Sequence, residues 1–214
     1  MTGPIVFIVD DDAGIRYSIA FLLEANKLTC RSYVSAEEFL AACEPGQAGC
    51  LLLDVRMPGM DGPALQMELA RRGIRLPIIF LTAFADLGTG IEAMKRGALD
   101  FLTKPVNGAD LLQRVRAAIE LDRCWRMVEH RRKAFSMRLE KLSPREYRVL
   151  SLAMSGLKND EISIRLKISQ RTTEGHRSRI CLKTGVNSLA ELVQQAAAAG
   201  FAMNVFAPGA DEAG

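Results

Sequence analysis

Five polar residues stand at the ends of short apolar runs in the first half of the chain: Asp10, Asp11, Asp54, Thr82 and Lys104. Three carboxylates held together would repel each other and resist ionisation unless a cation lay among them. Oxygen ligands of this kind suit Mg²⁺, which binds through a few carboxylates together with phosphate oxygens. A lysine ammonium and a threonine hydroxyl suit a phosphoryl group. The set therefore predicts a site at which Asp54 acts as a carboxylate nucleophile and becomes an acyl phosphate.

Alternating strands and helices must bring these residues together. The apolar runs recur at even intervals, and each is short enough for a strand: Ile5 to Val9, Leu28 to Tyr33, Cys50 to Leu53, Ile78 to Leu81 and Asp100 to Leu102. Segments with apolar residues at helical spacing lie between them. This alternation predicts an α/β domain with a doubly wound parallel sheet. Ligands bind beyond the carboxyl ends of the strands in such sheets, which is where the five polar residues stand.

A purely structural interpretation competes for each residue alone, because aspartate at a strand end commonly caps a helix or begins a turn. The whole set favours the chemical interpretation, since its members stand at matching ends of four strands.

Four stretches resemble the receiver domain of two-component response regulators: "FIVDDD", "LLLDVRMPGMDG", "IIFLTAFAD" and "GALDFLTKP". The resemblance covers about residues 4–122 and implies a flavodoxin-like (βα)5 fold. It implies that Asp54 is the phospho-acceptor. It also implies that Asp10, Asp11 and Asp54 hold Mg²⁺ together with the main-chain carbonyl of Arg56.

The same resemblance assigns roles to residues around this pocket. It implies that Lys104 binds the phosphoryl group, and that Thr82 and Phe101 are the pair that moves when the group arrives. Asp12 would cap the first helix, and the bond between Lys104 and Pro105 would be cis. Glycines 88 and 90 lead us to expect a mobile start to the helix after the fourth strand.

The two halves of the chain differ in charge. Residues 1–122 carry 12 Lys or Arg against 16 Asp or Glu, a net charge of −4, whereas residues 123–214 carry 16 against 9, a net charge of +7. An acidic half suits a divalent cation, and a basic half suits a polyanion such as DNA, although a basic face is often only solvated surface. The difference favours two domains that meet different partners.

A helical linker is expected over residues 123–138, because no Pro or Gly interrupts the chain between Leu121 and Leu142. Its apolar residues give this segment more apolar surface than a disordered linker needs. We therefore expect it to pack between the domains or against a second chain. A mobile linker is the competing interpretation. Residues 201–214 are expected to form a disordered tail, since they are mostly small, contain Gly and Pro, and carry two acidic residues near their end.

Helix signals recur in the basic half. Ser143 and Pro144 with Glu146 mark a helix start, with a capping hydroxyl, a proline at the first position and an acid in the first turn. A second helix is expected from about Asn159 to Leu166, and Ser169 would cap a third that begins near Gln170. Two helices joined by a short turn are the sequence form of a helix-turn-helix, whose second helix enters the major groove of DNA.

Residues 139–200 resemble the DNA-binding domain of the LuxR or NarL type, through "LSPREYRVL", "SGLKNDEI" and "KTGVNS". A fourth helix from Ser188 to Ala199 would complete this four-helix domain. Residue matching gives eight candidates for DNA contact: Glu174, Gly175 and Ser178 toward the bases, and Arg171, Thr172, Arg177, Arg179 and Lys183 toward phosphates or bases.

Two residues depart from the pattern of that family. Thr173 stands where an apolar Val is usual, and Gly175 stands where a larger side chain is usual. A glycine inside a helix lowers helix stability by about 1 kcal/mol relative to alanine. We therefore expect the recognition helix to be more flexible before it binds DNA.

Together the two resemblances indicate a response regulator transcription factor of the FixJ type. They imply phosphorylation of Asp54 by a partner sensor histidine kinase, homodimerisation when phosphorylated, and binding to two half-sites in double-stranded promoter DNA. We expect a cytoplasmic protein without a membrane segment. Five scattered cysteines fit a reduced compartment, and no apolar run approaches the roughly 20 residues of a membrane span.

Two other functions stay open at this point. A phosphorylation-independent DNA-binding regulator would keep the pocket without using it. An aspartyl phosphatase or phosphotransferase also uses an aspartate nucleophile and Mg²⁺, but such enzymes commonly carry a second acid two residues after the nucleophile. Arg56 occupies that position here, so we do not expect an enzyme.

Overall fold

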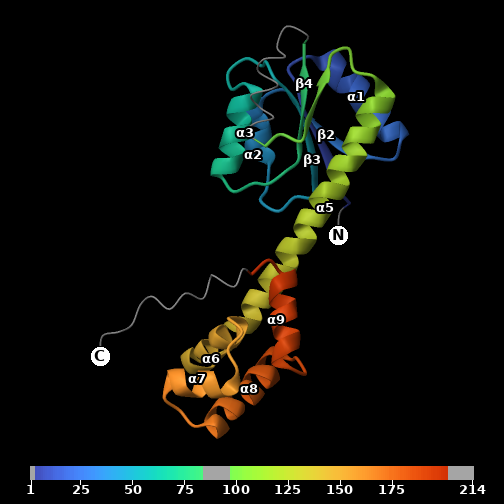
Figure 1. Cartoon of the computed structure of the whole chain (residues 1–214). Coiled ribbons are helices and arrows are strands. Elements are labelled where there is room, and N and C mark those ends of the chain that lie inside the picture. The colour runs from blue at the N-terminus through green and yellow to red at the C-terminus, as the bar shows by residue number, and fades with distance from the viewer. Residues whose placement is uncertain (1–2, 84–96, 202–214) are drawn as a thin grey trace. The chain divides into compact units, whose positions relative to one another are not determined.

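The computed structural model describes residues 3–83 and 97–201 (Figure 1). The chain forms two compact units, residues 1–125 and 126–214, and each is described by itself.

Within the described residues, the first unit contains a five-stranded parallel sheet in the order β2-β1-β3-β4-β5. The strands are β1 (Ile5–Val9), β2 (Thr29–Tyr33), β3 (Gly49–Asp54), β4 (Ile78–Thr82) and β5 (Asp100–Thr103). Val9 of β1 pairs with Leu53 of β3, and Thr82 of β4 pairs with Thr103 of β5. Because the strands are parallel and in this register, their carboxyl ends meet at one edge of the sheet.

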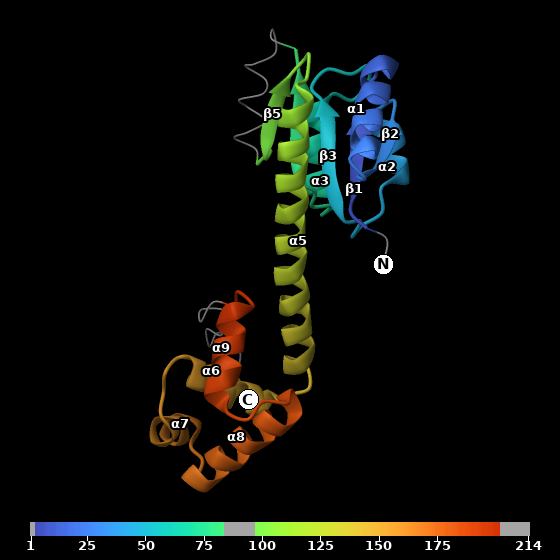
Figure 2. The same cartoon turned by 90° about the vertical axis from the view of Figure 1, so that its right-hand side faces the viewer.

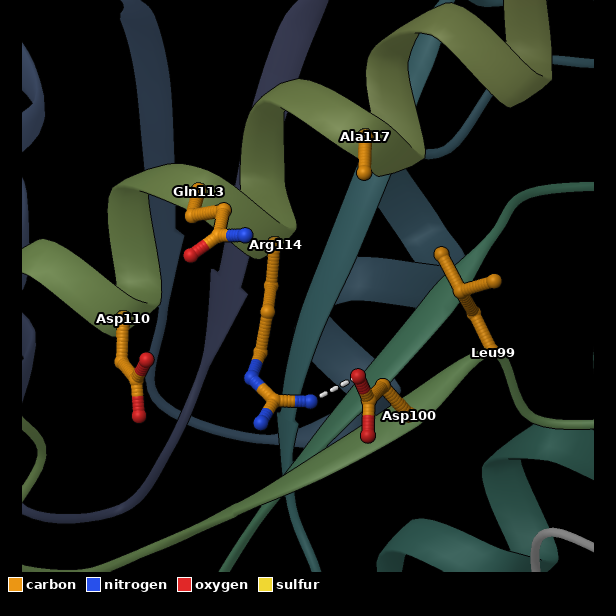
Figure 3. Close-up of a pocket in the computed structure, with 6 residues that line it drawn as sticks. All are labelled: Leu99, Asp100, Asp110, Gln113, Arg114 and Ala117. Atoms are coloured by element: carbon orange, nitrogen blue, oxygen red, sulfur yellow. Dashed lines mark hydrogen bonds and ion pairs between the residues drawn. The ribbon is translucent and has the colours of Figure 1, made fainter.

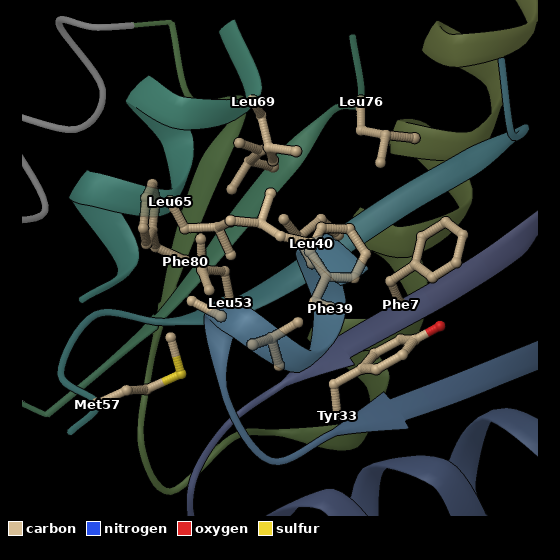
Figure 4. Close-up of a cluster of buried hydrophobic side chains, with 14 of the residues drawn as sticks. Phe7, Tyr33, Phe39, Leu40, Leu53, Met57, Leu65, Leu69, Leu76 and Phe80 are labelled. Carbon is tan, nitrogen blue, oxygen red and sulfur yellow. The ribbon is translucent and has the colours of Figure 1, made fainter. Parts of the chain in front are cut away.

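Helices cover both faces of this sheet: α2 (Ala36–Ala42) and α3 (Gly62–Arg71) on one face, α1 (Ala13–Ala25) and α5 (Gly108–Leu139) on the other (Figure 1, Figure 2). The central strands are apolar at successive positions because side chains from both of their faces are buried. Phe7 and Leu53 pack with Phe39 of α2 and Leu65 of α3 (Figure 4). Ile8 and its neighbours on the opposite face pack against α1 and α5. Strands held between two helical layers give the edge residues a rigid base.

The second unit is helical. It contains the end of α5, which contributes residues to both units, and α6 (Pro144–Met154), α7 (Asn159–Leu166), α8 (Gln170–Thr184) and α9 (Leu189–Ala198). Phe135 of α5 is fully buried with Leu150, Ile162, Ile180 and Leu192, one from each of the other helices. This arrangement confirms the expected fold class, an α/β sheet domain followed by a helical domain. Residues 123–138, the expected linker, are helical throughout.

The helix starts follow the sequence signals. Ser143 and Glu146 form a capping box at the start of α6, and Pro144 is its first residue. Ser169 caps α8 by accepting the Thr172 N–H. Lys167, with a left-handed φ of 52°, makes the turn between α7 and α8.

Two expectations of the sequence lie outside the described residues. They are the mobile helix start at Gly88 and Gly90, and residues 202–214 of the expected disordered tail. The expected tail began one residue too early, because the Phe201 ring packs on Phe135 with centroids 5.0 Å apart. Among the helices within residues 3–83 and 97–201, none has both the length and the apolarity needed to cross a membrane.

Candidate functional site

Asp10, Asp11 and Asp54 come together at the carboxyl edge of the sheet. One carboxylate oxygen from each lies within 4.8 Å of the other two. Asp10 is fully buried and Asp54 is 7% exposed, whereas Asp11 is open to solvent. The sequence prediction that folding gathers these three side chains agrees with this geometry.

Lys104 lies between two of these carboxylates. Its Nζ is 2.7 Å from Oδ2 of Asp10 and 3.1 Å from Oδ2 of Asp54. The Lys104 N–H donates to the main-chain oxygen of Thr82 at 2.8 Å, so the end of β5 is tied to the end of β4. The bond from Lys104 to Pro105 is cis, as expected. A positive charge is therefore fixed beside the proposed phospho-acceptor.

The surroundings shift the pKa of both groups. Burial and the neighbouring charge of Asp10 raise the pKa of Asp54. Hydrogen bonds from Lys104 and from the Arg56 main chain oppose this change without cancelling it. Burial disfavours the charged form of Lys104, but the two carboxylates outweigh burial and raise the pKa of its ammonium. Repulsion between the carboxylates thus remains only partly balanced by one lysine.

The donor set fits a magnesium ion. Mg²⁺ takes oxygen ligands at about 2.0–2.1 Å, so oxygens on opposite sides of the ion lie about 4.2 Å apart. The three carboxylate oxygens lie within 4.8 Å of one another, close enough to gather around a single ion. Burial is the main cause of the raised pKa of Asp54, and an ion of this charge would relieve the additional repulsion from Asp10.

The remaining predicted residues of this edge also lie close by in the fold. Thr82 is buried at the end of β4, and its hydroxyl donates to the main-chain oxygen of Ala83 at 3.0 Å. Phe101 is half-buried on β5 and packs against the apolar cluster on the α2 and α3 side. Asp12 caps α1 by accepting the N–H groups of Gly14 and Ile15, which confirms its expected role.

A pocket of about 310 Å³ opens beside β5 and α5 (Figure 3). Arg114 of α5 forms an ion pair with Asp100 at the start of β5. The other carboxylate oxygen of Asp100 accepts the Phe101 N–H at 2.8 Å. Asp10, Asp11 and Asp54 do not line this pocket. Asp100 instead links Arg114 of α5 to the main chain of Phe101, the proposed switch residue.

One contact at the carboxyl edge was missed by the sequence interpretation. Glu37 of α2 accepts the Met60 N–H, in the loop after Asp54, at 3.0 Å. The residues are 23 positions apart, and no pattern of spacing or type relates them.

Helix α8 presents a mixed surface. Six of the eight candidate DNA contacts are exposed: Arg171, Thr172, Glu174, Ser178, Arg179 and Lys183. Gly175 is half-buried. Thr173 is fully buried, and its hydroxyl lies 2.9 Å from the hydroxyl of Ser163 on α7. The departure from Val at this position therefore places a hydrogen bond inside the contact between the two helices of the helix-turn-helix.

Two of the predicted DNA contacts already have partners within the unit. Arg177 donates to Asn159 Oδ1 of α7 at 2.7 Å. Lys183 Nζ lies 2.7 Å from Oε2 of Glu146 on α6, whose side chain is only 3% exposed. Burial opposes ionisation of Glu146, but the Lys183 ammonium and the capping bonds of Ser143 prevail and lower its pKa to about 2. Charged and polar side chains thus join the apolar core in holding α8 against α6 and α7.

Comparison with known families assigns both units. Residues 6–116 match the model of the response regulator receiver domain, and residues 140–196 match that of the LuxR family of bacterial regulatory proteins. The chain is a two-component response regulator. It combines a receiver domain with a LuxR-type DNA-binding domain, which confirms the resemblances seen in its sequence.

Relatives of this response regulator share both domains along nearly their whole length. It is 42% identical over 188 residues to the transcriptional regulatory protein TdiR of Thauera aromatica, covering 88% of this chain and 83% of TdiR. It is 41% identical over 197 residues to FixJ of Azorhizobium caulinodans, covering 92% and 93% of the two chains. Among solved structures, the response regulator StyR matches with a TM-score of 0.80 at 36% identity, over 92% of this chain and 99% of StyR. It is therefore a FixJ-like transcription regulator.

Proposed function

We propose that this response regulator receives a phosphoryl group on Asp54 from a sensor histidine kinase and then binds promoter DNA as a dimer. The observation that carries the proposal is the position of Lys104 Nζ, at 2.7 Å from Asp10 and 3.1 Å from Asp54. A lysine fixed beside the Asp54 carboxylate can form a charge-assisted hydrogen bond to a phosphoryl group bound there.

The transfer is a displacement at phosphorus. A carboxylate oxygen of Asp54 attacks the phosphorus atom of a phosphohistidine, the new P–O bond forms, and the P–N bond breaks. The imidazole leaves and takes a proton from solvent. Asp10, Asp11, Asp54 and the Arg56 carbonyl would hold Mg²⁺, which would neutralise charge on the phosphoryl oxygens. Lys104 adds its fixed charge to the same oxygens.

A surface suited to the kinase lies next to Lys104. Tyr17 and Phe21, one helical turn apart on α1, are 74% and 66% exposed. A hollow of about 590 Å³ beside them is lined by other α1 residues and by Lys104, Pro105 and Leu111. Exposed aromatic side chains beside an apolar hollow are typical of protein interfaces. A partner docked here would bring its histidine close to Asp54.

The phosphoryl group must then change a surface. New oxygens on Asp54 would attract the Thr82 hydroxyl, which now donates to Ala83, and would engage Lys104. Phe101 would turn inward, and the altered surface around β5 would become a contact between two chains. Two DNA-binding domains would then reach two half-sites in promoter DNA, in the cytoplasm.

Substitution of Asp54 tests this proposal. We expect Asp54→Asn to take up no labelled phosphate from a small phosphodonor, whereas the wild-type chain does so only with Mg²⁺. A beryllium fluoride complex, which mimics the phosphoryl group, should tighten DNA binding of the wild type and leave that of Asp54→Asn unchanged. Gel shifts measure the difference. Label retained by Asp54→Asn would contradict the proposal. Equal DNA binding with and without the mimic would favour a phosphorylation-independent regulator, and rapid turnover of a small phosphate ester would favour a phosphatase.

A further inference from the structure

The loop that follows Asp54 is fixed at its base by the main chain. It runs over residues 55–61 and contains Arg56, the proposed source of a metal ligand. The Gly62 N–H donates to the main-chain oxygen of Val55 at 3.0 Å, which closes the loop. A Cβ atom at Gly62 would lie 2.3 Å from the main-chain oxygen of Asp54, so only glycine permits this approach.

The tip of the loop is held by a side chain from another element. Oε1 of Glu37 on α2 accepts the Met60 N–H at 3.0 Å. Gly59 has a left-handed φ of 77°, and a Cβ atom there would lie 3.0 Å from the same oxygen. Glu37 accepts hydrogen bonds from its own N–H, from Ser35 and from Met60, and these lower its pKa. Its carboxylate is therefore ionised and able to accept at neutral pH.

Capping of α2 does not require Glu37. Ser35 is the N-cap residue and accepts the Glu38 N–H at 3.2 Å. Glu38 returns a bond by accepting the Val34 N–H at 2.7 Å. The two adjacent glutamates thus accept hydrogen bonds from different places. Glu38 accepts from the residue before the α2 cap, and Glu37 accepts from the loop beside the phosphorylation site.

We propose that Glu37 is a positioning residue of the phosphorylation site, which holds the loop of residues 55–61 so that the Arg56 main chain keeps its place beside Asp54. The Arg56 N–H already donates to the Asp54 carboxylate. A loop anchored at base and tip samples fewer conformations than one anchored at its base alone, so the metal ligands need less ordering when Mg²⁺ binds. The inference rests on the proposed function, because it concerns the same site.

Magnesium binding by the full chain tests the inference. We expect Glu37→Ala to weaken Mg²⁺ binding by about tenfold, the lower end of the loss seen when a group that orients metal ligands is removed. Glu37→Gln should stay within about twofold of the wild type, because its amide oxygen can accept the same Met60 hydrogen bond. The measurement is a calorimetric titration, accompanied by hydrogen exchange of the Met60 amide without metal, which should accelerate in Glu37→Ala.

Glu38→Ala is the matched control. It should lower the thermal midpoint through the loss of the cap while leaving Mg²⁺ affinity and Met60 exchange unchanged. Wild-type Mg²⁺ affinity in Glu37→Ala would overturn the inference and leave the proposed function intact. An equal loss in Glu38→Ala, or no recovery in Glu37→Gln, would also overturn it, since general stability or charge would then explain the effect. Absence of saturable Mg²⁺ binding in the wild type would instead contradict the proposed function.

Discussion

Lys183 and Arg179 lie one helical turn apart on α8, but their surroundings differ. Both side chains are exposed, but Lys183 is paired with the buried Glu146. Removal of the Lys183 ammonium leaves a buried carboxylate without its charged partner, a change that costs on the order of 1–3 kcal/mol. Removal of an exposed arginine leaves stability nearly unchanged and affects only what it would touch outside the protein.

We therefore predict opposite outcomes for two substitutions. Lys183→Met should lower the thermal midpoint clearly, and Arg179→Ala should not. Arg179→Ala should weaken DNA binding at all sequences and reduce the slope of log affinity against log salt by about 1. Thermal unfolding and gel shifts over a range of salt concentrations measure both effects. A reduced salt slope in a fully stable Lys183→Met protein would show that this lysine contacts phosphate instead.

The low pKa of Glu146, about 2 against an ordinary value of about 4.5, predicts how stability depends on pH. A depressed carboxylate pKa stabilises the folded state above pH 4.5, and that contribution is lost as the pH falls toward 2. Glu146→Gln should therefore be less stable than the wild type at pH 7, and the difference should shrink between pH 4.5 and pH 2.5. Urea unfolding of both proteins at several pH values measures it. A difference that stays constant over this range would mean that charge at Glu146 is not the cause.

The limits of sequence interpretation are clearest at single residues. The shared location of Asp10, Asp54 and Lys104 was predictable because the carboxyl ends of parallel strands meet at one edge of a sheet. The Lys183 partner was not predictable, because 37 positions separate it from Glu146 and the pairing depends on how α6 packs on α8. Residue matching placed Lys183 among the candidate DNA contacts, and that role stays a prediction.

Among the elements, α8 forms polar contacts with α6 and α7 and contains a glycine, a residue that destabilises a helix interior. Gly175 lies within the helix, and a Cβ atom there would meet its nearest neighbour, Arg179 Nη2, at an ordinary 3.9 Å. We predict that Gly175→Ala stabilises the second unit by about 0.5–1 kcal/mol, since alanine loses less backbone entropy and adds no clash. Chemical unfolding of the full chain measures the gain.

Gly62→Ala is a useful comparison for this prediction, because its Cβ atom would lie 2.3 Å from the main-chain oxygen of Asp54. It should destabilise the first unit, whereas Gly175→Ala should not. A destabilised Gly175→Ala protein would indicate that the helix needs glycine for a reason other than space. Weaker DNA binding by a stabilised Gly175→Ala protein would support the expected approach of this residue to the bases.

The elements themselves were largely predictable. The five strands begin and end within one or two residues of the apolar runs. For β1, β3 and β4 the reason is that strands buried on both faces are apolar at successive positions. Serine caps fixed the starts of α6 and α8, since a hydroxyl before a helical pattern satisfies free N–H groups. The tie of α2 to the loop after Asp54 was not predictable, because Glu37 is one of two adjacent glutamates in a helix start where either acid is favourable.

At the scale of the whole molecule, an acidic receiver and a basic DNA-binding domain are joined in one chain, with net charges of −4 and +7 on the two sequence halves. A single recognition helix grips one half-site with an affinity set largely by phosphate contacts. Two domains joined in a dimer bind the second half-site as an intramolecular step, which raises affinity by 10²-fold or more without any new contact. Under the proposed function, control of dimerisation would therefore be sufficient to control promoter binding.

This reasoning predicts that dimer formation and tight DNA binding appear together. Full-length protein with Mg²⁺ and the beryllium fluoride complex should sediment as a dimer, and its affinity for a two-half-site promoter should rise by roughly 10²-fold. Asp54→Asn should remain a monomer with weak affinity under the same conditions. A promoter with one half-site destroyed distinguishes dimerisation from a change within one chain. If dimerisation is the cause, the beryllium fluoride complex should have little effect on binding to this promoter. A full rise on the single half-site, by protein that sediments as a monomer, would mean that phosphorylation acts on each DNA-binding domain separately.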